Sequence, residues 1–249
     1  MKLLKVKNYE EMSRKASSII IEKIKELQRP VIGMATGSTP EGLYQCLIEA
    51  YQKGEVSFKD VSTFNLDEYV GMNLENLNSY QYYMNDKLFR YIDISPENTH
   101  LPNGNAGDLQ KECKEYEKQI GATGRIDIQI LGIGLNGHIG FNEPGTSFSS
   151  RTHIVDLDES TRHANARFFS SIDEVPTQAI TMGIGTIMES KLALLLVSGE
   201  KKAPALARLL TGHISVDFPA SILQAHSELV IIADEAACRL IDTSLQRIV

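Results

Sequence analysis

The sequence contains few cysteines and lacks any long apolar run, and both absences exclude classes of protein. Cys46, Cys113 and Cys238 are odd in number and show no metal-ligand spacing, so neither a disulfide framework nor a zinc knuckle is expected. The longest apolar stretches, such as Leu192–Val197, fall far below the ~18 residues of a membrane span. The first residues also lack the apolar core of a signal peptide. We therefore expect a cytoplasmic protein with no membrane partner.

An excess of basic residues is also missing, because 25 Lys and Arg face 32 Asp and Glu, for a net charge of −7. A nucleic-acid partner is not expected, since such a surface needs positive charge to displace phosphate counterions. Internal repeats and low-complexity tracts are absent. At 249 residues the chain exceeds the roughly 150 residues of an average domain, but α/β folds often reach this length as one unit. We therefore expect one domain, residues 1–249.

Short apolar, β-branched runs alternate with helical patterns along the chain. Such runs are typical of parallel strands that are covered on both faces. They lie at residues 31–35, 61–66, 126–133, 179–184, 192–197 and 229–233. The alternation predicts an α/β fold: a doubly wound, mostly parallel, Rossmann-like sheet with helices on both faces.

Local signals place several helix ends. Thr39, Pro40 and Glu41 supply an N-cap, a first-turn proline and a first-turn acid for a helix that reaches about residue 53. Asn78 or Ser79 can cap the next helix. A third helix is expected from residue 108 to residue 120, with Gly121 as its C′ residue.

Ligands of open α/β sheets bind at the carboxyl ends of the strands, so the segments after each run are the candidate site. The first is TGSTP at residues 36–40, where free N–H groups and a helix dipole favour an anion. Leu43 and Tyr44 stand where a P-loop requires Lys and Ser or Thr, which argues against a nucleoside triphosphate. The segment is either a phosphate site or a simple capped turn.

The segment GIGLNG at residues 132–137 matches G-x-G-x-x-G after a predicted strand. The residues that follow, HIGFNEPGTSF, contain two glycines and a proline where a dinucleotide site needs a helix, so NAD or FAD binding is disfavoured. His138 lies near Asn136 and Glu143, which could polarise an imidazole for proton transfer. The same histidine could equally be a satisfied structural residue.

Other candidates are uninformative when taken one at a time. Asp67 and Glu68 follow a predicted strand, where they could act as acid or base or could cap the next helix. Arg167 and Lys202 are two of the 25 cations, and a single surface charge is usually only solvated.

Taken together, these segments resemble the glucosamine-6-phosphate deaminase family. The matching segments are TGSTP at 36–40, TFNLDEY at 63–69, GIGLNGHIGFNEP at 132–144, SRT at 150–152, TR at 161–162 and NARFF at 165–169. They occur in order over most of the chain, and FNLDEY combined with GHIGFNEP is the specific part. The resemblance implies conversion of glucosamine 6-phosphate and water to fructose 6-phosphate and ammonia in amino-sugar catabolism, without a cofactor.

The resemblance also implies a role for each matching residue. Asp67 corresponds to the base that moves a proton from C2 to C1, and His138 to the group that opens the sugar ring with Glu143. Asn136 stands where many longer members carry Asp, so it is an accessory that can hydrogen-bond the imidazole but adds no charge. The phosphate of the substrate would be held by Gly37, Ser38, Thr39, Arg167 and Lys202.

Two further departures concern regulation. The chain is shorter than family members that N-acetylglucosamine 6-phosphate activates, and His153 stands where those members tend to carry Arg. Activation is therefore not expected, and the oligomeric state is left open between monomer and homo-oligomer.

Two other functions compete with the deaminase. A 6-phosphogluconolactonase has a similar scaffold, but lactone hydrolysis needs no base between C2 and C1. A sugar-phosphate sensor would resemble the effector domains of transcription regulators, but no helix-turn-helix segment or basic arm precedes the first predicted strand.

Overall fold

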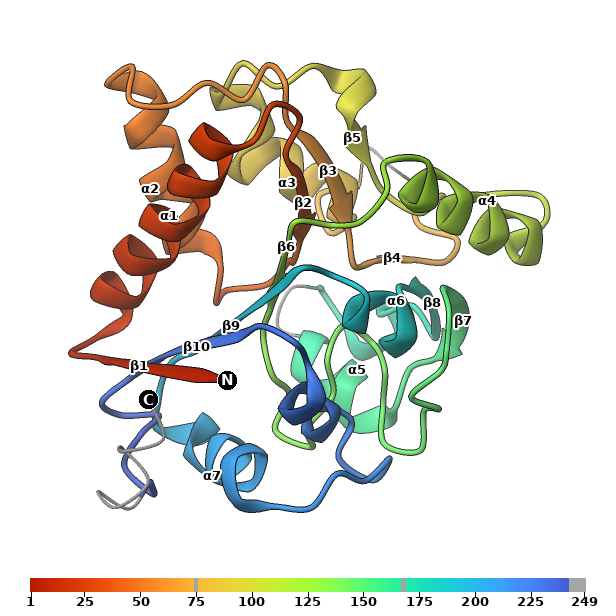
Figure 1. The fold of residues 1–249 in the computed structure, drawn as a ribbon. Helices are drawn as coiled ribbons and strands as arrows, with labels where there is room; N and C mark the ends of the chain where they lie inside the picture. The colour runs from red at the N-terminus through yellow and green to blue at the C-terminus, as the bar shows by residue number, and fades with distance from the viewer. Residues whose placement is uncertain (74–75, 167–168, 242–249) are drawn as a thin grey trace.

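A computed structural model describes residues 1–73, 76–166 and 169–241. Its central layer is a seven-stranded sheet in the order β1-β10-β9-β6-β2-β3-β5, and every neighbouring pair is parallel (Figure 1). The strands are β1 (Lys2–Val6), β2 (Val31–Met34), β3 (Ser62–Asn65), β5 (Thr99–His100), β6 (Ile128–Leu131), β9 (Leu192–Val197) and β10 (Leu229–Asp234). Five of the six apolar runs therefore form strands of this sheet, as predicted.

Helices cover both faces of the sheet, which confirms the predicted doubly wound α/β fold. The α-helices are α1 (Tyr9–Glu26), α2 (Glu41–Gln52), α3 (Tyr80–Lys87), α4 (Leu109–Ala122), α5 (Glu159–Asn165), α6 (Ile184–Met188) and α7 (Ala203–Thr211). The chain advances in one direction from β1 to β2, β3 and β5, and returns in the other from β5 to β6 and from β9 to β10. Right-handed crossovers then place α1 and α2 on one face and α4 and α7 on the other (Figure 1).

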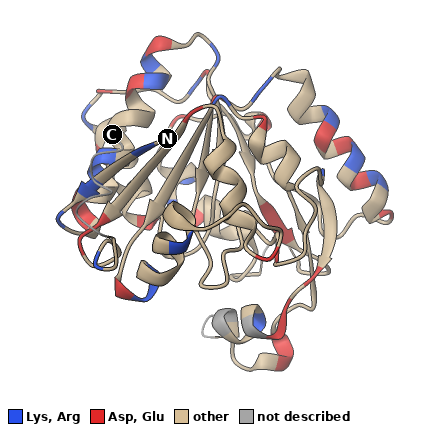
Figure 2. Cartoon of the chain, turned by 60° about the horizontal axis from the view of Figure 1, so that its bottom comes forward, with Lys and Arg blue, Asp and Glu red and all other residues tan. Residues whose placement is uncertain are grey.

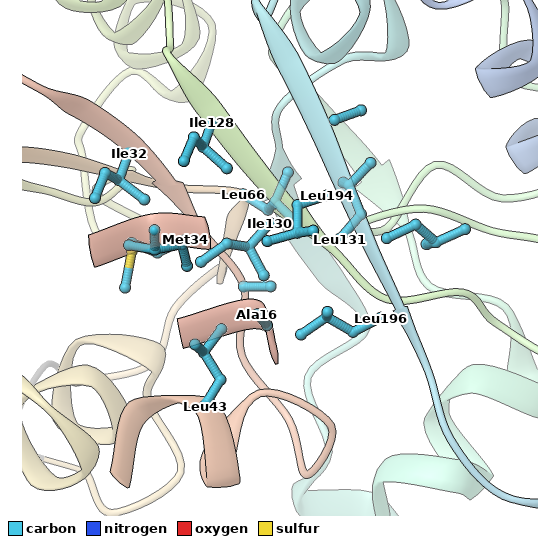
Figure 3. Packing of buried hydrophobic residues seen from close by; sticks show 14 of the residues in the cluster. Ala16, Ile32, Met34, Leu43, Leu66, Ile128, Ile130, Leu131, Leu194 and Leu196 are labelled. Carbon is cyan, nitrogen blue, oxygen red and sulfur yellow. The ribbon is translucent and has the colours of Figure 1, made fainter. Parts of the chain in front are cut away.

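The main core lies between the sheet and the helices. Figure 3 shows Ile130 of β6 and Leu194 of β9 near Met34 of β2, with Ala16 of α1 and Leu43 of α2 on the helical side. These side chains are almost fully excluded from water. Burial of this apolar surface is the main contribution that holds the layers together.

The run at residues 179–184 was wrongly expected in the parallel sheet. It forms β8 (Gln178–Thr181), which pairs antiparallel with β4 (Asp67–Tyr69) and β7 (His153–Asp156) in a separate three-stranded sheet. The backbone N–H of Met182 donates to the carbonyl of Leu66 at 2.6 Å, and this bond ties the small sheet to the end of β3. Apolar composition predicts a buried strand but does not determine which strand it pairs with.

Two predicted helix ends also differ from the structure. Helix α2 begins at Glu41 with Pro40 at the N-cap and no side-chain cap, so Thr39 does not cap it. Asp108 caps α4, but Gly121 lies inside that helix, and the cap follows at Thr123. Ser79 caps α3 by accepting the Tyr82 N–H, one of the two expected choices.

Short 3-10 helices connect the larger elements. They are η1 (Phe89–Tyr91), η2 (Pro96–Asn98), η4 (Ile172–Glu174), η5 (Glu200–Lys202) and η6 (Pro219–Ala225). Basic and acidic residues alternate along the helices and loops, whereas the central strands carry few of them (Figure 2). None of the helices in the described ranges has the length and apolarity needed to cross a bilayer.

Candidate active site

The strand order reverses direction between β2 and β6. From β2 the chain moves to β3 on one side, and from β6 it moves towards β9 on the other. The loops that leave two such neighbouring strands diverge to opposite faces and leave a crevice between them, where α/β proteins bind ligands. TGSTP follows β2 and GIGLNG follows β6, so the fold brings these two predicted segments together.

Two tyrosine hydroxyl groups hold the loop after β2 in place. The hydroxyl of Tyr83 donates to the carbonyl of Gly37 at 2.6 Å, and that of Tyr9 donates to the carbonyl of Ser38 at 3.0 Å. Gly37 has φ +91°, which favours glycine because it has no Cβ. With its carbonyls engaged in this way, the exposed Ser38 and the following α2 N-terminus form a turn that suits an anion.

Lys202 reaches the same rim from the segment after β9. It is the last residue of η5, and its Nζ donates to the carbonyl of Ile133, in the loop after β6, at 2.7 Å. The ammonium is therefore fixed beside the crevice. Arg167, the other predicted phosphate ligand, lies outside the described residues.

Asn136, His138 and Glu143 form one hydrogen-bonded group, as predicted. The amide of Asn136 donates to Glu143 Oε2 at 2.7 Å and accepts the His138 backbone N–H at 3.1 Å. Nδ1 of His138 lies 3.5 Å from the same Oε2. Glu143 is thus placed to orient the imidazole and to stabilise its protonated form.

Glu143 remains ionised although it is largely buried. Burial by itself would raise its pKa, but contacts from His138, Thr161 and Asn136 outweigh this and lower it below the usual value. Thr161 of α5 donates its hydroxyl to Glu143 Oε1. A carboxylate held in the charged form suits a partner for imidazolium.

Two glycines of GIGLNG make room for neighbouring rings. A Cβ on Gly134 would lie 2.5 Å from the His138 ring, and one on Gly137 would lie 2.1 Å from the Phe218 ring. Gly137 also has φ +87°. The glycines therefore allow the loop to fold tightly around the imidazole, which explains the pattern without NAD or FAD.

Asp67 is the first residue of β4 and is 6% exposed. Burial, together with repulsion from Glu68, raises the pKa of Asp67 to about 8. A buried carboxyl group with a raised pKa is suited to accept a proton from a bound molecule.

Glu68 has a structural task instead. Its carboxylate accepts the backbone N–H groups of Tyr69, Tyr80 and Gln81, at 2.8, 3.0 and 2.9 Å. Burial raises the pKa of Glu68 despite these bonds. The helix-capping alternative is therefore correct for Glu68, which caps α3, and not for Asp67.

Thr181 and Asn142 connect Asp67 to the segment at residues 132–144, which carries His138 and is called the histidine loop below. Thr181 is the cross-strand partner of Asp67, and its Oγ1 accepts the Phe141 N–H at 3.1 Å. The Asn142 amide donates to the carbonyls of Ile139 and Met182, both at 2.9 Å. These bonds place the histidine loop against the strand that carries Asp67.

Gly140 lies where the loop that carries His138 packs against Asp67 and Thr181. A Cβ there would lie 3.0 Å from Thr181 Oγ1 and 3.4 Å from Asp67 Oδ2. Aromatic rings of Tyr69, Tyr80 and Phe141 pack beside this point, with centroid separations of 4.8 to 6.1 Å. Their apolar surface accounts for the low polarity around Asp67.

Chemically, the site combines a base of raised pKa, an imidazole paired with a carboxylate, and a turn and an ammonium suited to phosphate. In the described ranges no group of three or more His, Cys, Asp or Glu side chains is placed to hold a metal ion. Thr161, Thr181 and the two loop-supporting tyrosines were not singled out as site residues from the sequence. Their contacts join distant segments, and only Thr161 lay in a matching motif.

Comparison with known proteins agrees with this geometry. A family model described as glucosamine-6-phosphate isomerases/6-phosphogluconolactonase matches residues 7–232. A glucosamine-6-phosphate deaminase of Oceanobacillus iheyensis is 63% identical over 237 residues, which cover 95% of this chain and 95% of that protein. Glucosamine-6-phosphate deaminase 1 of Bacillus subtilis is 53% identical and covers 96% of this chain and 99% of its own.

Solved structures extend the comparison to the fold. A monomeric glucosamine-6-phosphate deaminase superposes with a TM-score of 0.95 at 53% identity, covering 96% of this chain and 100% of that one. The 6-phosphogluconolactonase of Thermotoga maritima superposes with a TM-score of 0.75 at 21% identity, covering 94% and 99%. The second likeness concerns the fold alone.

Proposed function

The chain belongs to the family of glucosamine-6-phosphate isomerases and 6-phosphogluconolactonases, and we propose that it divides its reaction between a base on β4 and a ring-opening group after β6. The enzyme converts glucosamine 6-phosphate and water to fructose 6-phosphate and ammonia, a step of amino-sugar catabolism. The observation that carries this division is the junction at Gly140, which brings Asp67 and the histidine loop together.

Ring opening is the first step. His138 takes the proton of the anomeric hydroxyl and delivers a proton to the ring oxygen, which frees the C1 aldehyde. Glu143 stabilises the imidazolium formed in between, and Asn136 holds Glu143 in place. All of these groups lie in one short loop, so their geometry is set before substrate arrives.

Asp67 performs the isomerisation. Its carboxylate removes the proton from C2 and returns it to C1, while one proton passes from the substrate's ammonium group to the C1 oxygen. The amino aldehyde thereby becomes a protonated C2 imine with a C1 hydroxymethyl group. Water adds to the imine carbon, and ammonia leaves to give the ketose. The substrate's ammonium group favours the ionised form of Asp67, which opposes the effect of burial on its pKa.

The phosphate group is held at the opposite end of the sugar. Gly37, Ser38 and Thr39 offer backbone and hydroxyl donors, and Lys202 adds a charge, with Arg167 as the forked donor that the family resemblance implies. Binding at this remote group orients C1 and C2 towards Asp67.

Replacing Lys202 with Met is expected to raise KM for glucosamine 6-phosphate by about tenfold or more, because the phosphate loses a charged partner. The Lys201→Met variant is the matched control, since Lys201 is the exposed neighbour in the same short helix. Steady-state kinetics of both variants check the assignment. An equal KM for Lys202→Met and the unaltered enzyme would remove Lys202 from the phosphate site.

Replacing Asn136 with Asp is expected to move the pH dependence of kcat towards higher pH, since a second carboxylate would stabilise the imidazolium. The change keeps an acceptor for the His138 backbone N–H, but it removes the N–H that Asn136 donates to Glu143 and places two carboxylates side by side. A pH profile that does not move would show that Asn136 takes no part in the protonation of the imidazole.

The activity itself is tested by two assays on one preparation. Fructose 6-phosphate and ammonia are expected to appear in equal amounts from glucosamine 6-phosphate, and 6-phosphogluconolactone is expected to remain at its spontaneous rate of hydrolysis. Lactone hydrolysis without ammonia release would favour the lactonase instead. Binding of the amino-sugar phosphate without turnover would favour a sensor.

We further infer that the chain, residues 1–249, acts in the cytoplasm as a monomeric catalytic unit. A glucosamine-6-phosphate deaminase that is 53% identical to it is monomeric. N-acetylglucosamine 6-phosphate is not expected to activate the enzyme, because His153 stands where activated family members tend to carry Arg. Light scattering and rate curves with and without that sugar check both points.

A further inference from the structure

Asp234 is a buried carboxyl group outside the catalytic set. It is the last residue of β10 and is 5% exposed. A buried carboxylate needs hydrogen-bond donors to offset the loss of hydration, so its partners indicate its task.

Among residues 1–73, 76–166 and 169–241, the side chain of Asp234 accepts hydrogen bonds from the turns after β9 and β10. The hydroxyl of Ser198 donates to Oδ2 at 2.5 Å, and the N–H of Gly199 lies 3.1 and 3.0 Å from the two oxygens. The N–H of Ala237 donates to Oδ1 at 2.8 Å. Strands β9 and β10 pair in parallel with Val197 opposite Ala233, which places the carboxylate beside the first residues after β9.

The turn that Asp234 holds leads directly to Lys202. Gly199 adopts φ +90°, and its carbonyl accepts the Lys202 N–H at 3.0 Å. The Lys202 ammonium then reaches the Ile133 carbonyl at 2.7 Å. A continuous chain of hydrogen bonds therefore runs from Asp234 through Gly199 to the cation at the crevice.

A second tether supports the same short helix from its exposed side. Arg239, in the segment after β10, forms an ion pair with Glu200 of η5. Both side chains are largely exposed, so this pair contributes little compared with the buried carboxylate. The end of β10 therefore supports η5 through Asp234.

We propose that Asp234 is a positioning residue for phosphate binding, because it fixes the Ser198–Gly199 turn that directs Lys202 into the crevice. This inference rests on the proposed phosphate contact of Lys202. Asp234 itself does not touch the substrate.

Asp234→Asn tests the proposal with little change in volume. The amide replaces one acceptor oxygen with an NH2 group that cannot accept the Gly199 N–H, so the turn is held by fewer hydrogen bonds. We expect KM for glucosamine 6-phosphate and the inhibition constant of inorganic phosphate to rise together by about tenfold, with kcat within about threefold. An unchanged inhibition constant for phosphate would overturn the proposal.

Asp127→Asn is the matched control for a purely structural effect. Asp127 is also a buried carboxylate, and it accepts the Val31 N–H at 2.8 Å and the Lys191 ammonium at 2.7 Å. It lies at the amino ends of β2 and β6, on the rim opposite the crevice. This variant is expected to melt at a lower temperature while phosphate inhibition stays the same. A comparable loss of phosphate inhibition here would mean that the Asp234 effect is general destabilisation.

Lys202→Met separates the two ways of failing. If it leaves phosphate inhibition unchanged, the assignment of Lys202 is wrong. If it weakens phosphate inhibition while Asp234→Asn does not, only the role of Asp234 is wrong. In the double variant the two effects are expected to be less than additive, because both act through one ammonium.

If Asp234→Asn does not fold, Ser198→Ala is the alternative variant. It removes one donor to Asp234 and is expected to weaken phosphate inhibition by about threefold. Unchanged phosphate inhibition in Ser198→Ala would contradict the proposal.

Discussion

Replacement of Asp67 with Asn is expected to lower kcat for glucosamine 6-phosphate by at least ~10³-fold, because the amide cannot accept the C2 proton. The same variant is expected to be more stable than the unaltered enzyme at alkaline pH. Burial raises the pKa of Asp67 to about 8, so ionisation of this group disfavours the folded state. Replacement of a functional residue is thus expected to lower activity and raise stability, whereas replacement of a structural residue would lower stability.

The sign of the stability effect follows from the raised pKa. The group binds its proton more tightly when folded, so stability is lost as pH rises from the ordinary value of 3.8 through about 8. The melting temperature of Asp67→Asn should exceed that of the unaltered enzyme by roughly 5–10 °C at pH 8.5, and the gain should disappear below about pH 4. Scanning calorimetry at both pH values, with ammonia assays, checks this.

A wild-type rate in Asp67→Asn would exclude Asp67 as the base. In the unaltered enzyme, kcat/KM should rise with pH to about 8, since that profile reports the free enzyme. Glu68→Gln provides the contrast: it weakens the cap of α3 and is expected to lower the melting temperature.

Replacement of His138 with Gln is expected to lower kcat by about 10²- to 10⁴-fold through loss of the ring-opening proton transfer. Stability should change little, because the imidazole is partly exposed and its Nδ1 lies 3.5 Å from Glu143 Oε2, whereas the Asn136 amide holds the same oxygen at 2.7 Å. The linear analogue 2-amino-2-deoxyglucitol 6-phosphate has no ring to open. Its inhibition constant for His138→Gln should therefore stay within about threefold of its value for the unaltered enzyme.

His226→Gln is the control for this variant. His226 is 5% exposed, contacts the Ser190 hydroxyl at 3.2 Å and accepts the Glu228 N–H at 3.1 Å. Its loss is expected to lower the melting temperature and leave kcat within about twofold. Equal rates for His138→Gln and the unaltered enzyme would mean that the sugar ring opens without the imidazole.

The sequence was sufficient to predict the five inner strands of the large sheet and the loops of the candidate site, but not the edge strands β1 and β5. Strands such as β9 are continuously apolar, and strand ends of a parallel sheet share one rim. The pairing of β8 with β4 was not predictable from composition, because the same apolar run would suit either sheet. That pairing determines where Asp67 lies, so the incorrect prediction for residues 179–184 concerned the part of the fold that carries the proposed base.

Individual roles within the motifs depended on contacts between distant residues. Asp67 and Glu68 are adjacent acids in the sequence, and only the N–H groups of α3 distinguish the cap from the base. The segment SRT belongs to the family resemblance, yet the Thr152 N–H and Arg151 both contact Glu117 of α4 and support the fold. A motif therefore identifies residues that matter without stating what they contact.

The position of β4 has a consequence for how reactions diversify on this fold. The large sheet presents the proposed phosphate loops and the histidine that opens the ring, whereas Asp67 belongs to the small sheet attached through Leu66 and Met182. The proposed base and the proposed phosphate turn therefore stand on different sheets, so a substitution in the small sheet can alter the base without altering the loops that bind the phosphate.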